Sequence, residues 1–214
     1  TKQVSFAHLP ALESLNCGNT AVGVAGVGCL PPSLRELRMR FNLLHRSTDF
    51  SHLRALQVLD CSGTSQFRLL SAATIASLPP SLMVLDMGYS SVESCDWPPG
   101  GSLAHLTGLR KLRVTRTRID ASALASFPPS LHRLDLEVCT LSALGSFAHL
   151  HCLRRLVAEH VVLGDAVLAT LPPSLVSLDI RYRSMHWRDE SLTPAAVLPH
   201  LPALRALDVS GTAI

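Results

Sequence analysis

Leu30-Pro31-Pro32-Ser33-Leu34-Arg35-Glu36-Leu37-Arg38-Met39 is the stretch from which the fold can be read. Its first five residues return at 78–82 and 171–175, and with phenylalanine in the first place at 127–131. Each copy continues with a leucine three residues later and an apolar residue two further on, as the quoted stretch does. A phrase that recurs with the same continuation indicates a repeat protein.

A second phrase, His-Leu-x-x-Leu-x-x-Leu, alternates with the first and begins at His8, His52, His105, His149 and His200. Both phrases run into the pattern L-x-x-L-x-apolar, whose first leucine occurs nine times, at Leu12, Leu34, Leu56, Leu82, Leu109, Leu131, Leu153, Leu175 and Leu204. The steps between them are 22, 22, 26, 27, 22, 22, 22 and 29 residues. A period of 22 with three insertions is typical of leucine-rich repeats.

Counted from that leucine, positions three to five of each repeat are expected to form a short parallel strand. Positions one, four and six would point into the core, and positions three, five, seven and eight would face the concave side. Proline lacks an amide hydrogen, so the Pro-Pro pairs suit extended convex segments. Residues 120–126 and 164–170 are predicted to form short helical turns, N-capped by Asp120 and Asp165.

These expectations define the fold class as an α/β solenoid. It is a leucine-rich-repeat horseshoe of about nine repeats. A parallel β-sheet forms the concave face, and short helical turns and extended Pro-Pro segments form the convex face. We expect residues 1–214 to be one such domain and a fragment of a longer chain. Neither end shows a capping element, so further repeats or a neighbouring chain would cover the ends.

The ninth position of each repeat should carry a side chain that bonds the backbone where the strand turns away. Its occupants are Thr20, Asn42, Thr64, Ser90, Thr117, Cys139, Val161, Arg183 and Thr212. Threonine and serine can replace the signature asparagine or cysteine as hydrogen-bonding groups. Val161 and Arg183 break the pattern, and we expect local irregularity there.

Composition excludes several function classes. The net charge is only +3, and no run of five like charges occurs, which disfavours nucleic acid as the partner. No segment is long and apolar enough to span a membrane. The six cysteines form no C-x-x-C pair, so neither a zinc ribbon nor a redox motif is indicated. Free buried thiols and the absence of an Asn-x-Ser/Thr acceptor predict an intracellular, cytoplasmic protein.

The sequence predicts neither a catalytic site nor a metal-binding site. The recurrent histidines fall on alternate repeats, about 10 Å apart, too far to share a zinc ion. They are expected instead to bond backbone groups of the convex turns. The chain has no phosphate-binding glycine loop, G-x-S-x-G or H-E-x-x-H. We therefore predict no enzyme activity, cofactor, metal or small-molecule substrate.

The concave face is the predicted binding surface, and a protein is the expected partner. At position five, Arg38 would face Asp60, and Arg113 would lie between two aspartates, Asp86 and Asp135. Such a ladder can also be a self-satisfied, weakly stabilising feature of a solvated face. Arginine and tyrosine favour protein contacts. The candidate partner-binding residues are Arg38, Phe41, Tyr89, Lys111, Arg113, Arg116, Arg133, Glu137, Arg155, Glu159, His160, Arg181 and Tyr182.

Two of the insertions contain the tryptophans, Trp97 and Trp187. Insertions in solenoids often lie at binding faces. Each tryptophan is therefore either a lid over the edge of the core or an anchor for a partner.

With these repeats in hand, the chain resembles leucine-rich-repeat proteins over essentially its whole length. The Leu-Pro-Pro-Ser-Leu phrase resembles repeats of kinetoplastid leucine-rich-repeat proteins and is also similar to those of bacterial type III effectors. Alternation with the His-Leu phrase fits the former better. Some effectors carry a separate ubiquitin-ligase domain with a catalytic cysteine, and nothing in this chain matches it.

The resemblance implies a non-enzymatic protein-binding scaffold that uses its concave face. One alternative is a substrate-targeting arm of a larger enzyme such as a ubiquitin ligase. Another is a structural subunit of a large assembly, for example a ribonucleoprotein.

Overall fold

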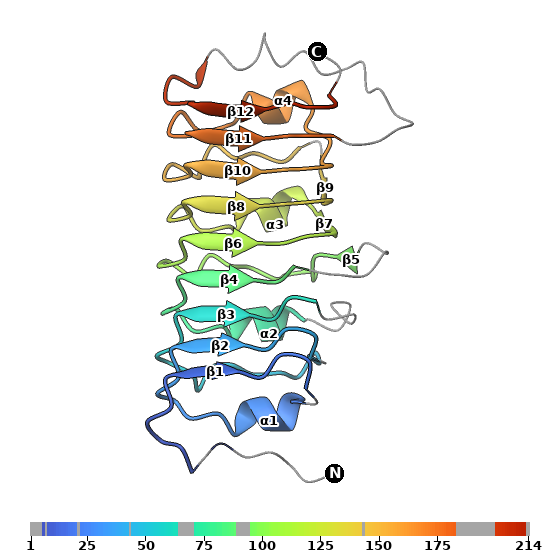
Figure 1. The fold of residues 1–214 in the computed structure, drawn as a ribbon. Helices are drawn as coiled ribbons and strands as arrows, with labels where there is room; N and C mark the ends of the chain where they lie inside the picture. The colour runs from blue at the N-terminus through green and yellow to red at the C-terminus, as the bar shows by residue number, and fades with distance from the viewer. Residues whose placement is uncertain are drawn as a thin grey trace.

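The computed structural model describes residues 6, 8–20, 22–42, 44–63, 71–88, 95–142, 144–182 and 200–212. Their chain winds into a solenoid whose coils stack one above another (Figure 1). A nine-stranded parallel sheet runs along it in the order β1-β2-β3-β4-β6-β8-β10-β11-β12. The strands are β1 (Ser14–Asn16), β2 (Glu36–Arg38), β3 (Val58–Asp60), β4 (Val84–Asp86), β6 (Lys111–Arg113), β8 (Arg133–Asp135), β10 (Arg155–Val157), β11 (Ser177–Asp179) and β12 (Ala206–Asp208). Positions three to five thus form the strand in every repeat, as predicted.

The leucine ladder forms one continuous core. In repeats two to eight, side chains at positions one, four and six are at most 4% exposed, which confirms the predicted inward register. Position-four leucines lie opposite one another across the sheet, from Leu15 and Leu37 to Leu178 and Leu207. At the last strand Leu207 is 46% exposed. Phe50, Phe127 and Phe147, outside the repeat signature, are also fully buried.

Four short helices lie behind the sheet (Figure 1). They are α1 (Val24–Gly28), α2 (Ala72–Ala76), α3 (Ala121–Ala125) and α4 (Asp165–Leu168), each just before a Pro-Pro phrase, as predicted. Asp120 caps α3 by accepting a hydrogen bond from the Ala123 amide at 2.7 Å. The second predicted cap is wrong, because Gly164 is the N-cap of α4 and Asp165 is its first helical residue.

The two alternating phrases bond each other, which explains their alternation. In every Pro-Pro repeat the serine hydroxyl donates to the position-one carbonyl of the repeat before it, as Ser33 does to Leu12 at 2.8 Å. In the His-Leu repeats a histidine Nε2 meets the carbonyl that precedes the previous Pro-Pro pair: His105 with Leu78 at 3.0 Å, and His149 and His200 likewise. The predicted backbone role is confirmed for these three histidines. His52 has a buried Nε2 with no hydrogen-bond partner in the described part of the chain.

The ninth-position side chains bond the turn backbone, as predicted. Asn42 donates to the carbonyls of Cys17 at 2.8 Å and Met39 at 3.0 Å and accepts from the Val22 amide at 3.2 Å. Thr20, Thr117, Cys139 and Thr212 each donate to one backbone carbonyl. Thr64, Ser90 and Arg183 lie outside the described residues.

Position eight adopts a left-handed conformation in most turns, with φ between +54° and +59° at Asn19, Phe41, Arg116, Val138 and His160. The irregularity predicted at Val161 is wrong. His160 turns with φ 59°, and the Val161 amide bonds the Ala158 carbonyl at 3.1 Å, as Cys139 bonds Leu136. The backbone turn therefore forms without a polar ninth side chain.

A second, three-stranded parallel sheet, which the sequence did not indicate, lies on the flank. It consists of β5 (Cys95–Asp96), β7 (Thr117–Ile119) and β9 (Thr140–Leu141). Among the described helices, none is long and apolar enough to cross a bilayer.

Candidate partner-binding face

The predicted partner-binding residues that the structure describes lie on strands of the nine-stranded sheet or in the turns that follow them. Arg38 and Phe41 belong to β2 and its turn, and the ten on repeats five to eight lie on the adjacent strands β6, β8, β10 and β11 or in the turns after them. Tyr89 falls outside the described residues. The repeat pattern thus predicted the strands and turns on which these residues lie, but it did not show which of their charges are already neutralised.

Four of the five aspartates at position five accept a hydrogen bond from the backbone amide two residues on. Asp86 accepts from the Gly88 amide at 2.9 Å, and Asp208 accepts from the Ser210 amide at 3.0 Å. Asp60 and Asp179 accept from the amides two residues on in the same way. These carboxylates thus cap the strand ends, and Asp86 and Asp208 also pair with arginines of the neighbouring repeats.

For the two arginines at position five, Arg38 and Arg113, the predicted neighbours in the sheet are confirmed, but the ion pairs differ. Arg38 lies opposite Asp60 in the sheet, yet its Nε donates to Glu36 on its own strand at 2.5 Å. Arg113 lies between two aspartates, Asp86 and Asp135, in register.

The partners found there differ from the prediction. Arg40, rather than Arg38, donates to Asp60. Arg113 forms an ion pair with Asp86 at 3.6 Å and a second one with Glu137 at 3.4 Å, not with Asp135. Asp135 accepts both its bonds from Arg133 Nε, at 2.9 and 3.0 Å. Strand register alone does not choose among carboxylates that a long arginine side chain can reach.

Arg181 is neutralised by three carboxylates. It binds Asp179 through Nε and Nη2, each at 2.9 Å, and it contacts Glu159 at 3.1 Å and Asp208 at 3.4 Å. Hydrogen bonding to Asp179 is the main cause that raises the pKa of Arg181. We call this group the Arg181 cluster (Glu159, Asp179, Arg181, Asp208). The Tyr182 ring packs edge-on against His160 beside it, with centroids 5.8 Å apart.

A second group of basic residues has other basic residues, and not carboxylates, as its neighbours across the strands. Lys111, Arg133 and Arg155 lie opposite one another on β6, β8 and β10. Neighbouring strands are about 4.8 Å apart, and like charges directly opposite destabilise a sheet. In the described part of the chain Arg133 is paired with Asp135, but neither Lys111 nor Arg155 forms an ion pair.

Arg110 and Arg154 extend this group, and sequence reasoning missed them because position two was not assigned to the binding face. Backbone bonds hold the segments side by side: Arg133 donates to the Arg110 carbonyl and Arg155 to the His132 carbonyl, each at 3.0 Å. Arg110 and Arg154 are exposed. We call these five residues the basic strip (Arg110, Lys111, Arg133, Arg154, Arg155).

Phe41 is a separate feature of the face. Its side chain is 58% exposed, and its ring lies so close to Gly63 that a Cβ there would stand 2.5 Å from it. Strands β3 and β4 separate Phe41 from the basic strip. Trp97 is only 5% exposed, donates to the Gly101 carbonyl at 2.8 Å and packs edge-on against Phe127, so it is a lid and not an anchor. Trp187 lies outside the described residues.

The cysteines whose side chains the structure describes are buried, half-buried or exposed free thiols. Cys17, Cys61 and Cys139 are buried free thiols, and burial raises the pKa of Cys61 and of Cys17. Such thiols pack as small apolar groups and are poor nucleophiles. Within the described residues no three His, Cys, Asp or Glu side chains come together as metal ligands.

No protein-family model matches the chain, and no curated protein matches it. Solved structures do. Toll in the Drosophila Toll–Spatzle complex matches with a TM-score of 0.67, 19% identity, and coverage of 98% of this chain and 29% of Toll. Human 5T4, the trophoblast glycoprotein, gives a TM-score of 0.66 at 22% identity, and the match covers 95% of this chain and 82% of that one.

Internalins of Listeria monocytogenes are also similar. Internalin C2 gives a TM-score of 0.61 at 19% identity, covering 92% of this chain and 80% of that one. The internalin InlF gives a TM-score of 0.55 at 17% identity. The match covers 95% of this chain and 62% of that one. At these identities the matches show the fold, and the chain has the leucine-rich-repeat fold.

Proposed function

We propose that this chain is a non-enzymatic scaffold that binds a protein partner on its concave face, with the basic strip holding an acidic segment of that partner. The observation that carries the proposal is the ladder of Lys111, Arg133 and Arg155, in register on adjacent strands. Cross-strand repulsion of this kind costs stability, and partner carboxylates would remove the cost. The fold supports this function, because solenoids provide extended concave binding surfaces.

Acidic side chains around the strip favour a protein over a nucleic acid. Asp135, Glu137 and Glu159 lie on the same face, next to the strip. A phosphate backbone would meet these carboxylates, whereas a protein can place single acidic residues between them. Arg181 and Arg113 are not assigned to the contact, since their charges are already neutralised.

The narrower assignments are also proposals. The alternation of the Leu-Pro-Pro-Ser-Leu and His-Leu phrases supports a relationship to kinetoplastid leucine-rich-repeat proteins. The free, buried thiols of Cys17, Cys61 and Cys139 support a reducing, intracellular compartment. Protein extracted from its own cells directly into a denaturant that contains an alkylating agent should then carry alkylated cysteines and no disulfide.

A charge-reversal experiment tests the site. The triple variant Lys111→Glu, Arg133→Glu and Arg155→Glu should lose the partner in quantitative affinity capture while keeping the circular dichroism of the native chain. The matched control reverses three exposed arginines away from the strip, Arg46, Arg54 and Arg205, and changes the net charge equally. The control should capture as the native chain does.

Equal capture by the two triple variants would contradict the assignment of the strip. Capture that nuclease treatment abolishes would contradict a protein partner and favour the ribonucleoprotein alternative.

A further inference from the structure

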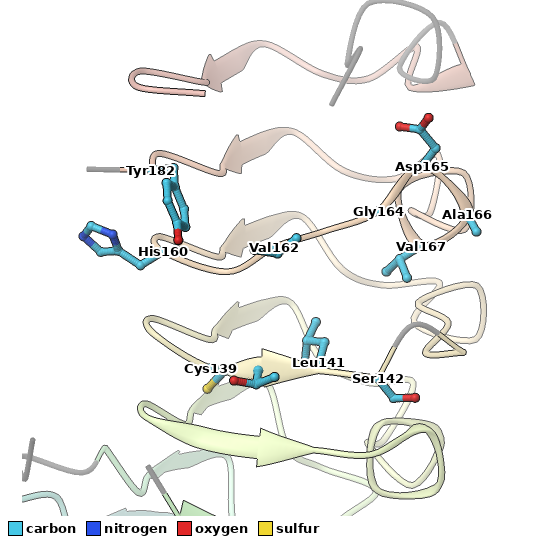
Figure 2. Close-up of a pocket in the computed structure, with 11 residues that line it drawn as sticks. Cys139, Leu141, Ser142, His160, Val162, Gly164, Asp165, Ala166, Val167 and Tyr182 are labelled. Carbon is cyan, nitrogen blue, oxygen red and sulfur yellow. The ribbon is translucent and has the colours of Figure 1, made fainter. Parts of the chain in front are cut away.

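A hollow of about 500 Å³ lies on the flank of the solenoid, off the concave face, between β9 and the chain segment that leads into α4. Figure 2 shows His160 and Tyr182 at one end of it and Asp165, Ala166 and Val167 at the other. Its volume is within the range of clefts that bind ligands. A second hollow of about 440 Å³ shares Thr140, Leu141 and Ser142 with it, so the two form one groove across the small sheet.

The edge of β9 that faces this groove is unpaired. Ser142 donates to the Ile119 carbonyl at 3.1 Å, so its amide points toward β7. Because successive residues of a strand bond to alternate sides, the Leu141 N–H and C=O point the other way, into the groove. In the described part of the chain no backbone hydrogen bond joins 140–142 to 162–164.

The repeat period explains the open edge. Val162 lies 22 residues after Thr140, so a regular solenoid would place the fourth strand of the flank sheet there. Instead the chain continues through Gly164 into α4 at Asp165. Val162 is left 53% exposed beside the groove. An open sheet edge next to an apolar side chain is the arrangement to which an extended peptide can add as a strand.

The charges along the groove indicate whether a bound peptide would be acidic or basic. Arg118 is paired with Asp96 at 3.3 Å. Asp120 and Asp165 have no cationic partner among the described residues, and both are exposed. We propose that the groove binds an extended, basic segment of a partner protein, which adds as a strand to the free edge of β9 and places lysine or arginine near Asp120 and Asp165.

Two capped hexapeptides serve as probes, Lys-Val-Lys-Val-Lys-Val and its acidic counterpart with glutamate for lysine. In ¹⁵N NMR spectra the basic peptide should shift the Leu141 amide and slow its hydrogen exchange. The acidic peptide should leave Leu141 unchanged, since any contact that it makes belongs to the basic strip. The strip variant of the previous subsection should still bind the basic peptide, so this proposal and the proposed function can fail separately.

A matched pair of glycines provides the blocking variant. Gly164 and Gly23 are both helix N-caps with negative φ, and a Cβ at either meets no atom within 4 Å. Gly164→Trp should fill the groove and weaken binding of the basic peptide by about tenfold or more. Gly23→Trp, at α1, should leave the affinity unchanged. Asp165→Lys, an exposed change that tests charge without filling the groove, should also weaken it.

Three results would overturn the proposal. The first is a basic peptide that does not bind at roughly millimolar concentration, the weak end of specific affinity. The second is binding that Gly164→Trp and Asp165→Lys leave unchanged. The third is an acidic peptide that shifts the Leu141 amide as strongly as the basic one.

Discussion

The Arg181 cluster and the basic strip lie on the same concave sheet, yet they use positive charge in opposite ways. Arg181 has three carboxylates within 3.4 Å. Of the three residues in the strip's ladder, only Arg133 has a carboxylate partner among the residues that the structure describes. The cluster therefore links the repeats of β10, β11 and β12 through side chains, whereas we propose that the strip's charge is used to bind another molecule. Under this proposal, the pairing of the arginines with carboxylates, and not the number of arginines, separates a stabilising contact from a binding surface on this face.

The largest expected effect tests whether the two regions share one core. Leu134 lies under the strip and Leu178 under the cluster, with exposures of 0% and 1%. Leu134→Ala and Leu178→Ala should each lower the free energy of unfolding by about 2–5 kcal/mol, because each leaves a cavity. Denaturant unfolding measures both. A loss of only a few tenths of a kcal/mol for either variant would mean that its leucine is not packed in the core.

Removing one arginine from each region should give opposite results. Arg181→Ala leaves Glu159, Asp179 and Asp208 close together without their cation, so the thermal midpoint should fall. Arg155→Ala relieves repulsion from Arg133 and should leave stability unchanged or raise it by up to about 0.5 kcal/mol. Differential scanning calorimetry decides. A loss of stability in Arg155→Ala as large as in Arg181→Ala would erase the distinction between the two regions.

Salt should reduce both differences, and this is the smallest effect. Raising the ionic strength from about 0.1 M to about 1 M shortens the Debye length from about 10 Å to about 3 Å. The gain in stability of Arg155→Ala should then disappear, and the loss of stability of Arg181→Ala should become smaller. Thermal midpoints of both variants and the native chain across a salt series measure this. Differences that do not change with salt would point to packing and not charge.

The sequence predicted the strands, core register and helices because leucine spacing is a direct record of which side chains must be buried. The flank sheet escaped prediction, since Thr117–Ile119 and Thr140–Leu141 carry no leucine pattern of their own. Val161 was expected to disturb its turn, but the turn forms through backbone bonds and the left-handed His160. A hydrophobic side chain at position nine is simply buried there.

The repeat pattern predicted the strand register of the candidate face, but it did not predict which ion pairs form there. Arg113 was expected to lie between Asp86 and Asp135, and it does, but Asp135 accepts a hydrogen bond from Arg133 on its own strand. Several carboxylates lie within reach of each arginine, and the backbone bonds of the aspartates decide which remain available. The doublets Arg110-Lys111 and Arg154-Arg155 were nevertheless visible, two repeats apart in the same phase. Reading position two together with position three would have found the strip.

Carbodiimide cross-linking of the captured complex tests the central claim most directly. This reagent joins a lysine amine to a carboxylate that already contacts it, and the chain has only two lysines, Lys2 and Lys111. Mass spectrometry should identify an amide bond between Lys111 and an aspartate or glutamate of the partner. A complex in which Lys111 stays open to acetylation and forms no bond to the partner would contradict the account.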